Sequence, residues 1–236
     1  MTALLEIVND VLIETGYQEL GTVVGNGSNT ARRILGLANR EGRMLAKKNW
    51  KILLKRNIFN TASSAENYSL PTDFDRFIDN THWNLSNASP MDGPVSTQRW
   101  QENKSGATSI TVNDRFQVRA DGNARRYFID PVPTSTEQVS FFYASKTWCR
   151  SAGGERQDKW EADDDVLLLD DFVYQLGLTW RWLRANRRPY DEEFNEYETE
   201  RDKAFARDGG LDGLRILGPV DDWSPMANIA ETGFGS

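Results

Sequence analysis

The sequence contains one cysteine, one histidine and no long apolar run, and each shortage excludes a class of protein. The single thiol, Cys149, cannot form a disulfide within the chain, which excludes a disulfide-stapled secreted scaffold and fits a reducing, intracellular origin. A mean hydropathy of -0.62 and the lack of long apolar runs exclude a transmembrane helix. The opening "MTALLEIVNDVL" places Glu6 and Asp10 within its apolar periodicity and has no basic segment, so we predict that it is not a signal peptide.

These shortages also argue against catalytic chemistry. One histidine, His82, provides no basis for a Ser-His-Asp triad or a histidine metal site, and we expect a loop residue there. We expect Cys149 to be a small buried residue at the end of a strand rather than a nucleophile. The acidic cluster lacks the spaced glycine and final glutamate of a calcium loop, so helix capping is the preferred role for Asp163, Asp164, Asp165, Asp170 and Asp171. We therefore predict no enzyme activity, no metal and no cofactor.

The charge balance limits how the chain can treat nucleic acid. Its 236 residues carry a net charge of -7, with a pI of about 4.9. Tight duplex binding relies on Lys and Arg neutralising phosphates, so an acidic chain argues against it. The same charge is compatible with DNA that slides past. One basic run is expected to be a solvated face where a helix meets a strand: Lys47, Lys48, Lys51, Lys55 and Arg56.

Apolar periodicity predicts two helices at the start of the chain. The first begins at Leu4 and stops at Gly16, which is a good C-terminal cap position. The second runs from about 30 to 49, after the loop "GTVVGNGSN", with Ser28, Asn29 and Thr30 as candidate N-caps. That loop resembles a phosphate loop, but the Lys-Ser/Thr pair that grips phosphate is missing. We expect a flexible linker between two paired helices.

Strands and turns dominate the next hundred residues. "WKILLKRNIF", beginning at Trp50, predicts a strand, and Pro71 ends another in "NYSLPTDFDRF". In "RFQVRADGNARRYFID", two alternating runs meet at Asp121-Gly122-Asn123, which favours a hairpin with positive-φ turn residues. "QVSFFYASKTWC" predicts a further strand. The segment around Trp100 predicts a loop with about one helical turn.

The most informative segment is a helix from 166 to 187 that is apolar on two opposite faces. The first face holds Leu169, Phe172, Val173, Leu176, Trp180 and Leu183. The second holds Leu167, Tyr174, Leu178 and Trp182. Since a surface helix needs only one apolar face, we expect this helix to lie inside a bundle or between two subunits. The second face would then be covered by the chain's own N-terminal helices or by a neighbouring copy.

Charge is distributed unevenly around this helix and the next one. The acidic cluster from Asp163 to Asp165 is expected to mark the start of the two-faced helix, where negative charge complements the dipole. A basic block follows at its end, formed by Arg181, Arg184, Arg187 and Arg188. After Pro189 comes an acidic block that contains Asp191, Glu192, Glu193, Glu196, Glu198, Glu200 and Asp202. Opposite charges on different faces of one subunit permit head-to-tail contacts that close into a ring, although salt bridges within the chain explain part of the pattern.

The sequence after 208 changes character again. It is rich in glycine and proline, which excludes a long helix, yet it carries more apolar residues than a solubilising tail requires. We predict an extended arm that docks on a partner; the alternative is a partly disordered terminus. The expected fold is α+β, with a helical bundle (1–49 and 160–208), an inserted antiparallel β-rich domain (50–159) and an extended C-terminal arm (209–236).

The ordered set of segments resembles a known family. It comprises the helical pair, "NWKILLKRNIF", "YSLPTDFDRFI", "PVSTQRW", "VSFFYASKTW" and "WEADDDVLLLDDFVYQLGLTWRWLRANRRPYDEEFNEYE". In this order they resemble the head-to-tail adaptor proteins of short-tailed bacteriophages, relatives of tail tubular protein A. The likeness extends from about residue 4 to 210 and is densest over 160–207. No single motif is diagnostic.

The resemblance implies a virion protein of the head–tail junction that forms a ring of about twelve copies. Its partners would be further copies of itself, the portal protein and the tail nozzle protein, with no membrane involved. Genome DNA would pass through the central channel without specific binding, which suits an acidic protein. In such proteins a helical domain builds the ring, a β-rich domain faces the tail and the arm reaches the portal.

Two groups of residues are predicted to serve this function. For the ring interface they are Tyr174, Leu178, Arg181 and Trp182. For portal docking they are Leu214, Ile216, Leu217, Trp223 and Phe234. A second hypothesis, a glycan-binding tail module, rests on the eight tryptophans and the β-rich middle. A small nucleic-acid-processing enzyme is the third.

Overall fold

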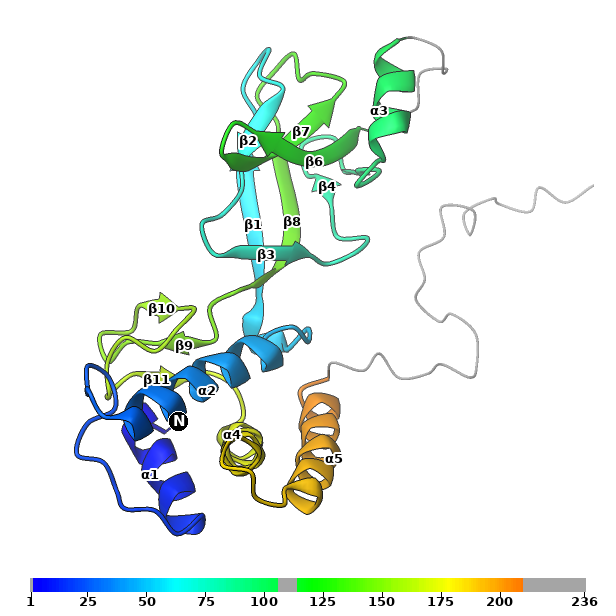
Figure 1. Ribbon diagram of the computed structural model, residues 1–236. Helices are drawn as coiled ribbons and strands as arrows, with labels where there is room; N and C mark the ends of the chain where they lie inside the picture. Colours follow the sequence, from blue (N-terminus) through cyan, green and yellow to red (C-terminus); the bar gives the residue numbers. More distant parts are fainter. Residues whose placement is uncertain (1, 106–113, 210–236) are drawn as a thin grey trace, which may run out of the picture.

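The computed structural model describes residues 2–105 and 114–209, and its fold is α+β. Helices from both ends of the chain pack together at one end of the molecule, beside a small sheet within residues 149–167, and the two other antiparallel sheets lie at the opposite end (Figure 1). The predicted fold class is confirmed for these parts. The extended arm of that prediction lies outside the described residues.

The helices follow from local signals, with some differences at their ends. They are α1 (Leu4–Glu14), α2 (Asn29–Leu45), α3 (Thr97–Lys104), α4 (Asp171–Ala185) and α5 (Asp191–Arg207). Helix α1 stops before Gly16, whose φ of +81° suits the predicted cap position. Ser28 caps α2 by accepting from the amide of Ala31 at 3.2 Å. Helix α2 ends at Leu45 rather than 49, where the Trp50 indole donates to the Leu45 carbonyl at 2.8 Å.

Helix α4 begins later than its apolar pattern predicts. Residues 166–167 form a strand, and Asp170 caps the helix by accepting from the amide of Val173 at 3.0 Å. The prediction that the acidic residues at 163–165 mark the helix start is therefore wrong. Asp163 instead accepts from the amides of Val23 and Val24, and Asp165 accepts from those of residues 161 and 162. These carboxylates fix loops.

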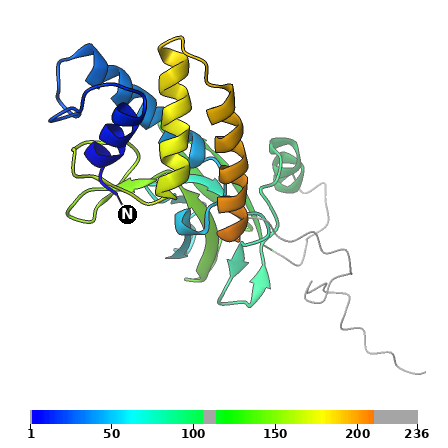
Figure 2. The same ribbon diagram turned by 90° about the horizontal axis from the view of Figure 1, so that it is seen from below.

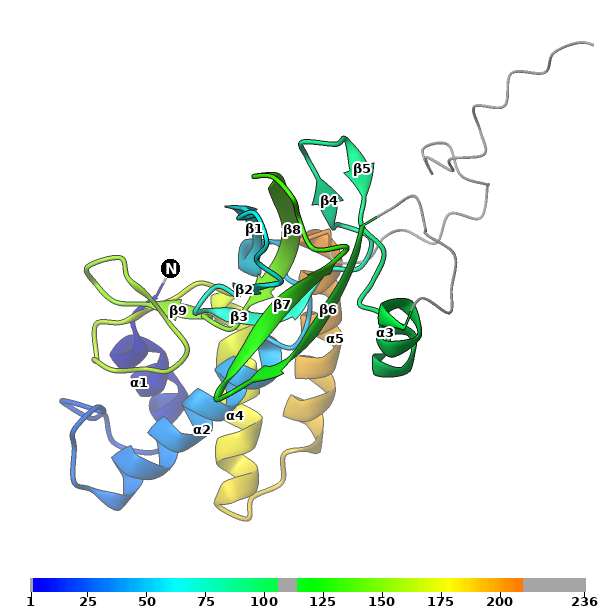
Figure 3. The same cartoon turned by 90° about the horizontal axis from the view of Figure 1, so that it is seen from above.

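The middle of the chain forms three antiparallel sheets. Their strands are β1 (Leu54–Asn60), β2 (Asn67–Ser69), β3 (Phe74–Phe77), β4 (Trp83–Asn84), β5 (Ser89–Pro90), β6 (Arg115–Asp121), β7 (Ala124–Asp130), β8 (Gln138–Ser145), β9 (Cys149–Arg150), β10 (Arg156–Gln157) and β11 (Val166–Leu167). The largest sheet has the order β1-β8-β4-β5, with β3 also paired to β8. The others are β2-β7-β6 and β10-β9-β11. Viewed from above, the β6–β7 hairpin lies in front of α4, and α3 lies at the periphery (Figure 3).

Three local expectations in this region need adjustment. Strand β1 begins at Leu54 rather than at Trp50, because Lys51–Leu53 forms a 3₁₀ turn. The segment around Trp100 is a two-turn helix rather than a loop with one turn, and Ser96 caps it by accepting from the amide of residue 99 at 3.3 Å. The predicted hairpin of β6 and β7 is confirmed. At its two-residue turn Gly122 has a φ of +60°, and among the described residues Asn123 is not in the positive-φ set.

The buried apolar side chains form two clusters. One joins α1, α2, α4 and α5 to the small sheet formed by β10, β9 and β11, and it includes Trp50, Leu53, Trp148 and Cys149. The other fills the β-rich part around Phe116, with aromatic side chains from β7 and β8. Within the described ranges, no helix has both the length and the apolar character needed to cross a membrane.

Candidate assembly surfaces

Helix α4 lies in the middle of the helical cluster, between α1 and α2 on one side and α5 on the other (Figure 2). The Tyr174 side chain points toward α2 and is fully buried. Its hydroxyl donates to the carbonyl of Ala38 at 2.6 Å and accepts from the Trp160 indole at 2.8 Å. Burial raises the pKa of Tyr174 well above its ordinary value. This phenol is therefore a neutral connector inside the core.

The remaining predicted ring residues are also buried within the single chain. Leu178 belongs to the helical cluster, and Trp182 meets the ring of Tyr17 edge-on at a centroid distance of 5.2 Å. Arg181 forms an ion pair with Glu41 of α2. Of the two partners that the sequence left open for the second apolar face, the chain's own N-terminal helices supply the cover. A neighbouring subunit is not needed to explain the burial of these side chains.

The first apolar face of α4 packs mainly on α5. Trp180 lies edge-on to Phe194 at 5.0 Å and near Tyr197 at 6.1 Å. Phe172, by contrast, is exposed at the start of the helix. The two faces therefore have different partners, and both partners lie in this chain.

Negative and positive side chains that form no ion pair with a described residue lie on different helices. At the start of α5, the carboxylates of Asp191, Glu192, Glu193 and Glu196 form no ion pair with any described residue. The same holds, among the residues that the structure describes, for the guanidinium groups of Arg32, Arg40 and Arg43 on α2. Arg184 and Arg187 are exposed at the end of α4, whereas Arg181 is paired and Arg188 donates to the Thr15 carbonyl at 2.6 Å. The predicted basic block is thus split between core and surface.

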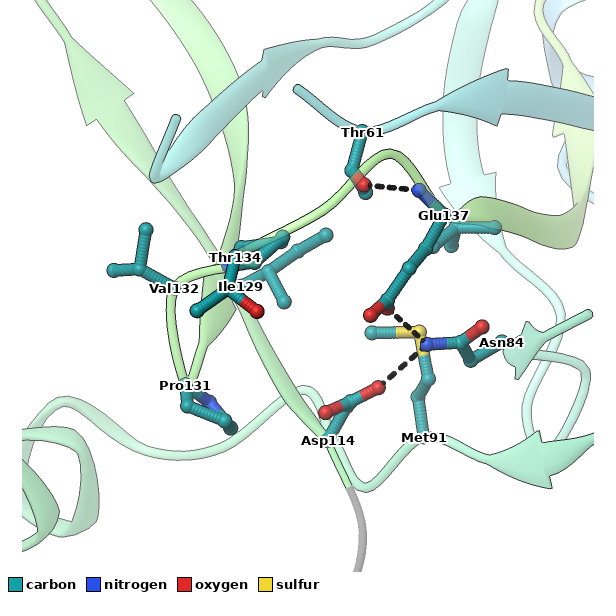
Figure 4. Close-up of a pocket in the computed structure, with 11 residues that line it drawn as sticks. Thr61, Asn84, Met91, Asp114, Ile129, Pro131, Val132, Thr134 and Glu137 are labelled. Carbon is teal, nitrogen blue, oxygen red and sulfur yellow. Dashed lines mark hydrogen bonds between the residues drawn. The ribbon is translucent and has the colours of Figure 1, made fainter. Parts of the chain in front are cut away.

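A small cavity of about 130 Å³ lies in the β-rich part (Figure 4). The buried amide of Asn84 donates to a carboxylate oxygen of Asp114 at 2.7 Å and to one of Glu137 at 2.6 Å. Thr61 contributes a second link, because its hydroxyl accepts from the Glu137 amide at 2.8 Å. One neutral side chain thus holds two carboxylates from different loops, and this satisfies the buried amide.

The histidine and the cysteine of the chain are both buried. Across the ranges that the structure describes, no group of three or more His, Cys, Asp or Glu side chains could hold a metal ion. His82 is a buried loop residue among Phe77, Phe116 and other aromatic rings, and burial lowers its pKa to about 4. Burial, together with nearby carboxylates, raises the pKa of Cys149 to about 12, which leaves the thiol protonated at neutral pH.

The tryptophans bear on the glycan hypothesis. A glycan platform requires exposed indole faces. Six tryptophans are buried: Trp50, Trp100, Trp148, Trp160, Trp180 and Trp182. Trp83 is half-buried in β4, between β8 and β5, and Trp223 lies outside the described residues. These six tryptophans pack in the core, as the sequence predicted for most of them.

Sequence reasoning missed two connecting residues. Glu41 is the partner of Arg181, and Asn84 organises the cavity. A carboxylate on the apolar side of the 30–49 helix was the available signal for Glu41. Asn84 offered none, because its partners are distant in sequence. The residues predicted for portal docking lie outside the described residues: Leu214, Ile216, Leu217, Trp223 and Phe234.

Comparison with known proteins supplies the identity. No curated protein sequence matches the chain. A family model described as SU10 adaptor protein matches residues 2–226, which span the helices of both ends and all the sheets. The match agrees with the resemblance in the sequence at the level of an adaptor protein. Because it covers nearly the whole chain, the chain belongs to the SU10 adaptor protein family.

Proposed function

We propose that this protein is a structural adaptor of the bacteriophage head–tail junction. It forms a ring, of about twelve copies, that joins the portal protein to the tail nozzle and lets genome DNA pass. The observation that carries the proposal is the adaptor-family match over residues 2–226. A core that leaves no evident catalytic constellation in the described ranges also fits a virion structural component.

Each part of the chain has a role in this proposal. The helical domain (1–49 and 160–208) builds the ring, and the β-rich domain (50–159) faces the tail. The arm (209–236) docks on the portal through Leu214, Ile216, Leu217, Trp223 and Phe234. The acidic net charge favours passage of DNA over binding, since few cations are present to neutralise phosphates.

Contacts between copies are proposed on the exposed charged faces of the helical domain. The unpaired carboxylates of α5 complement the unpaired guanidinium groups of α2, and a heterologous contact of this kind closes a ring. In this arrangement Tyr174, Leu178 and Trp182 support the ring indirectly, because they fix α4 between the two charged helices.

The oligomeric state of the full chain, with and without the cognate portal protein, tests the function. Native mass spectrometry is expected to show ring-sized assemblies, either alone or on addition of portal. A monomer that ignores the portal and is retained on a glycan column would contradict the proposal and support a glycan-binding module.

The charged contact has its own test. Reversing Glu192 and Glu196 together to Lys is expected to weaken ring formation, since both are exposed and form no ion pair with a described residue. Adding Arg40→Glu and Arg43→Glu to the same chain is expected to restore it. Asp121→Lys, at the exposed hairpin tip, is the control. Unaltered assembly in the first variant would remove α5 from the interface and leave the adaptor function standing.

A further inference from the structure

The outer face of the β1–β8 pair carries apolar side chains that the described residues leave exposed. Ile58 is 47% exposed and Phe142 is 41% exposed. In the register of the pair, Ile58 lies opposite Ser140 and Phe142 lies opposite Arg56, so the two apolar side chains are diagonal neighbours on one face. The other face of the pair, with Phe59 and Phe141, packs into the aromatic core. The outer face is therefore an apolar surface beside the guanidinium of Arg56, which donates to the Ser140 hydroxyl at 3.5 Å and forms no ion pair with a described residue.

Strand β1 also has an open edge. Among the described residues it pairs only with β8. The Thr61 amide donates to the Glu137 carbonyl at 2.7 Å, so residues with odd numbers in β1 direct their main-chain groups toward β8. The main-chain groups of Arg56, Ile58 and Asn60 therefore point away from β8. Unpaired groups of this kind are a template for another strand.

The last described residues lie where β1 begins. The Lys51 amide donates to the carboxylate of Asp208, just after the end of α5, and Gly209 lies against the Lys51 side chain. The end of α5 and the start of β1 are close in the ribbon (Figure 1). The described structure thus ends at Gly209, near the start of β1.

The length of the outgoing chain matches this edge. Leu214 and Ile216 are five and seven residues beyond Gly209, which gives an extended reach of about 17–23 Å. Ile58 is seven residues beyond Lys51, a separation of about 20 Å. Asp212, Leu214 and Ile216 share one face of an extended segment, because side chains alternate. Asp212 comes before Leu214, as Arg56 comes before Ile58. In a parallel pairing, opposite charges would therefore lie side by side, and so would the apolar side chains.

We propose that in the free subunit residues 211–217 add to the open edge of β1 as a parallel strand of the same chain. Leu214 and Ile216 pack beside Ile58, and Asp212 lies beside Arg56. The inference concerns the unassembled subunit and does not require the portal. Where the adaptor function holds, the same apolar residues leave β1 when they dock on the portal. Covering them before assembly would protect the chain from aggregation.

Residue-resolved amide exchange of the full chain tests the proposal. The variant carries Leu214→Ser and Ile216→Ser, which lie outside the described residues and preserve chain length. Exchange at the amides of Arg56, Ile58 and Asn60 is expected to rise about tenfold or more. Exchange at Asn57 and Phe59 is expected to stay unchanged, because their amides bond to β8.

The matched control replaces Met226 and Ile229 by Ser, which removes as much apolar surface from the same arm outside the proposed strand. It is expected to leave all five amides unaffected. Equal exchange in the parent and the Leu214/Ile216 variant would overturn the proposal. Protection of Arg56 and Ile58 that disappears on dilution would also overturn it, since the covering strand would then come from a second copy.

Discussion

Arg181 of α4 and Glu41 of α2 form an ion pair that is closed to solvent, with side-chain exposures of 9% and 0%. Gly177 lies one turn before Arg181, and a Cβ at this position would clash with the Glu41 carboxylate. The absence of a side chain there lets the carboxylate approach α4. Burial and the nearby Glu41 raise the pKa of Tyr197 on α5. Three helices therefore meet at one buried pair.

Removing one partner of this pair is expected to be costly. Glu41→Ala leaves a buried guanidinium without its counter-charge and should lower the free energy of unfolding by about 3–5 kcal/mol. Urea denaturation at pH 7 measures the loss. Glu198→Ala, which breaks an exposed pair with Arg201, is the control and should cost less than about 1 kcal/mol. Equal losses in the two variants would show that the Glu41 pair does not stabilise the helical cluster.

Core packing and ring contact make different predictions for Leu178. Because the side chain is fully buried in the isolated chain, Leu178→Ala should lower the free energy of unfolding by about 2–5 kcal/mol. The loss should be present in dilute monomer and independent of protein concentration, as checked by denaturation at several concentrations. A monomer of normal stability that no longer assembles would instead place Leu178 in the ring interface.

Periodicity predicted that α4 is buried on two faces, and this follows from the physics of the pattern. The apolar stripes that contain Tyr174 and Trp180 indicate that both faces of the helix are buried. They do not indicate whether the same chain or a neighbouring subunit buries them. The partner became visible only with the fold, because α2 lies more than a hundred residues earlier in the chain. Family resemblance directed attention to a neighbouring subunit, while the chain's own helices cover these side chains.

Other differences arise where several residues offer the same local signal. The cluster from Asp163 to Asp171 contains five possible caps, and Asp170 caps α4 because its carboxylate reaches the amide of Val173. Helix α3 is short and polar, so Ser96 was its main local signal. The hairpin at Gly122 was predictable, because turn residue and strand alternation agree. Sequence analysis thus located elements better than their ends or partners.

Stability should depend on pH through His82. Burial among aromatic rings lowers its folded-state pKa from 6.5 to about 4, so the unfolded chain binds the proton more tightly. The contribution of His82 to the free energy of unfolding is fully present above pH 6.5. As the pH falls toward 4, about 3 kcal/mol of this contribution is lost. Urea denaturation of the parent and of His82→Phe across this range should show a smaller loss in the variant. Parallel curves would mean that His82 titrates normally in the folded chain.

Cys149 should resist alkylation in the folded protein. Its thiol is buried, its pKa is raised to about 12, and it donates to the carbonyl of Lys159 at 3.3 Å. Iodoacetamide at pH 8 is expected to modify it only at the rate of unfolding, measured by mass spectrometry. Asn195→Cys, on the exposed side of α5, adds a surface thiol that should react quickly in the same molecule. Comparable rates at both positions would show that the small sheet opens readily.

Asn84 is predicted to stabilise the β-rich part by donating hydrogen bonds to two carboxylates. Asn84→Asp replaces an amide that donates to Asp114 and Glu137 by a third carboxylate, so both hydrogen bonds are lost and like charges are brought together. The free energy of unfolding should fall by about 2–4 kcal/mol at pH 7. At pH 4.5 the loss should be smaller, because protonation of the introduced carboxyl restores a donor. Asn87→Asp, on the exposed loop nearby, should have little effect at either pH. A loss for Asn84→Asp that does not change with pH would indicate that misfit of the side chain, rather than charge, destabilises the variant.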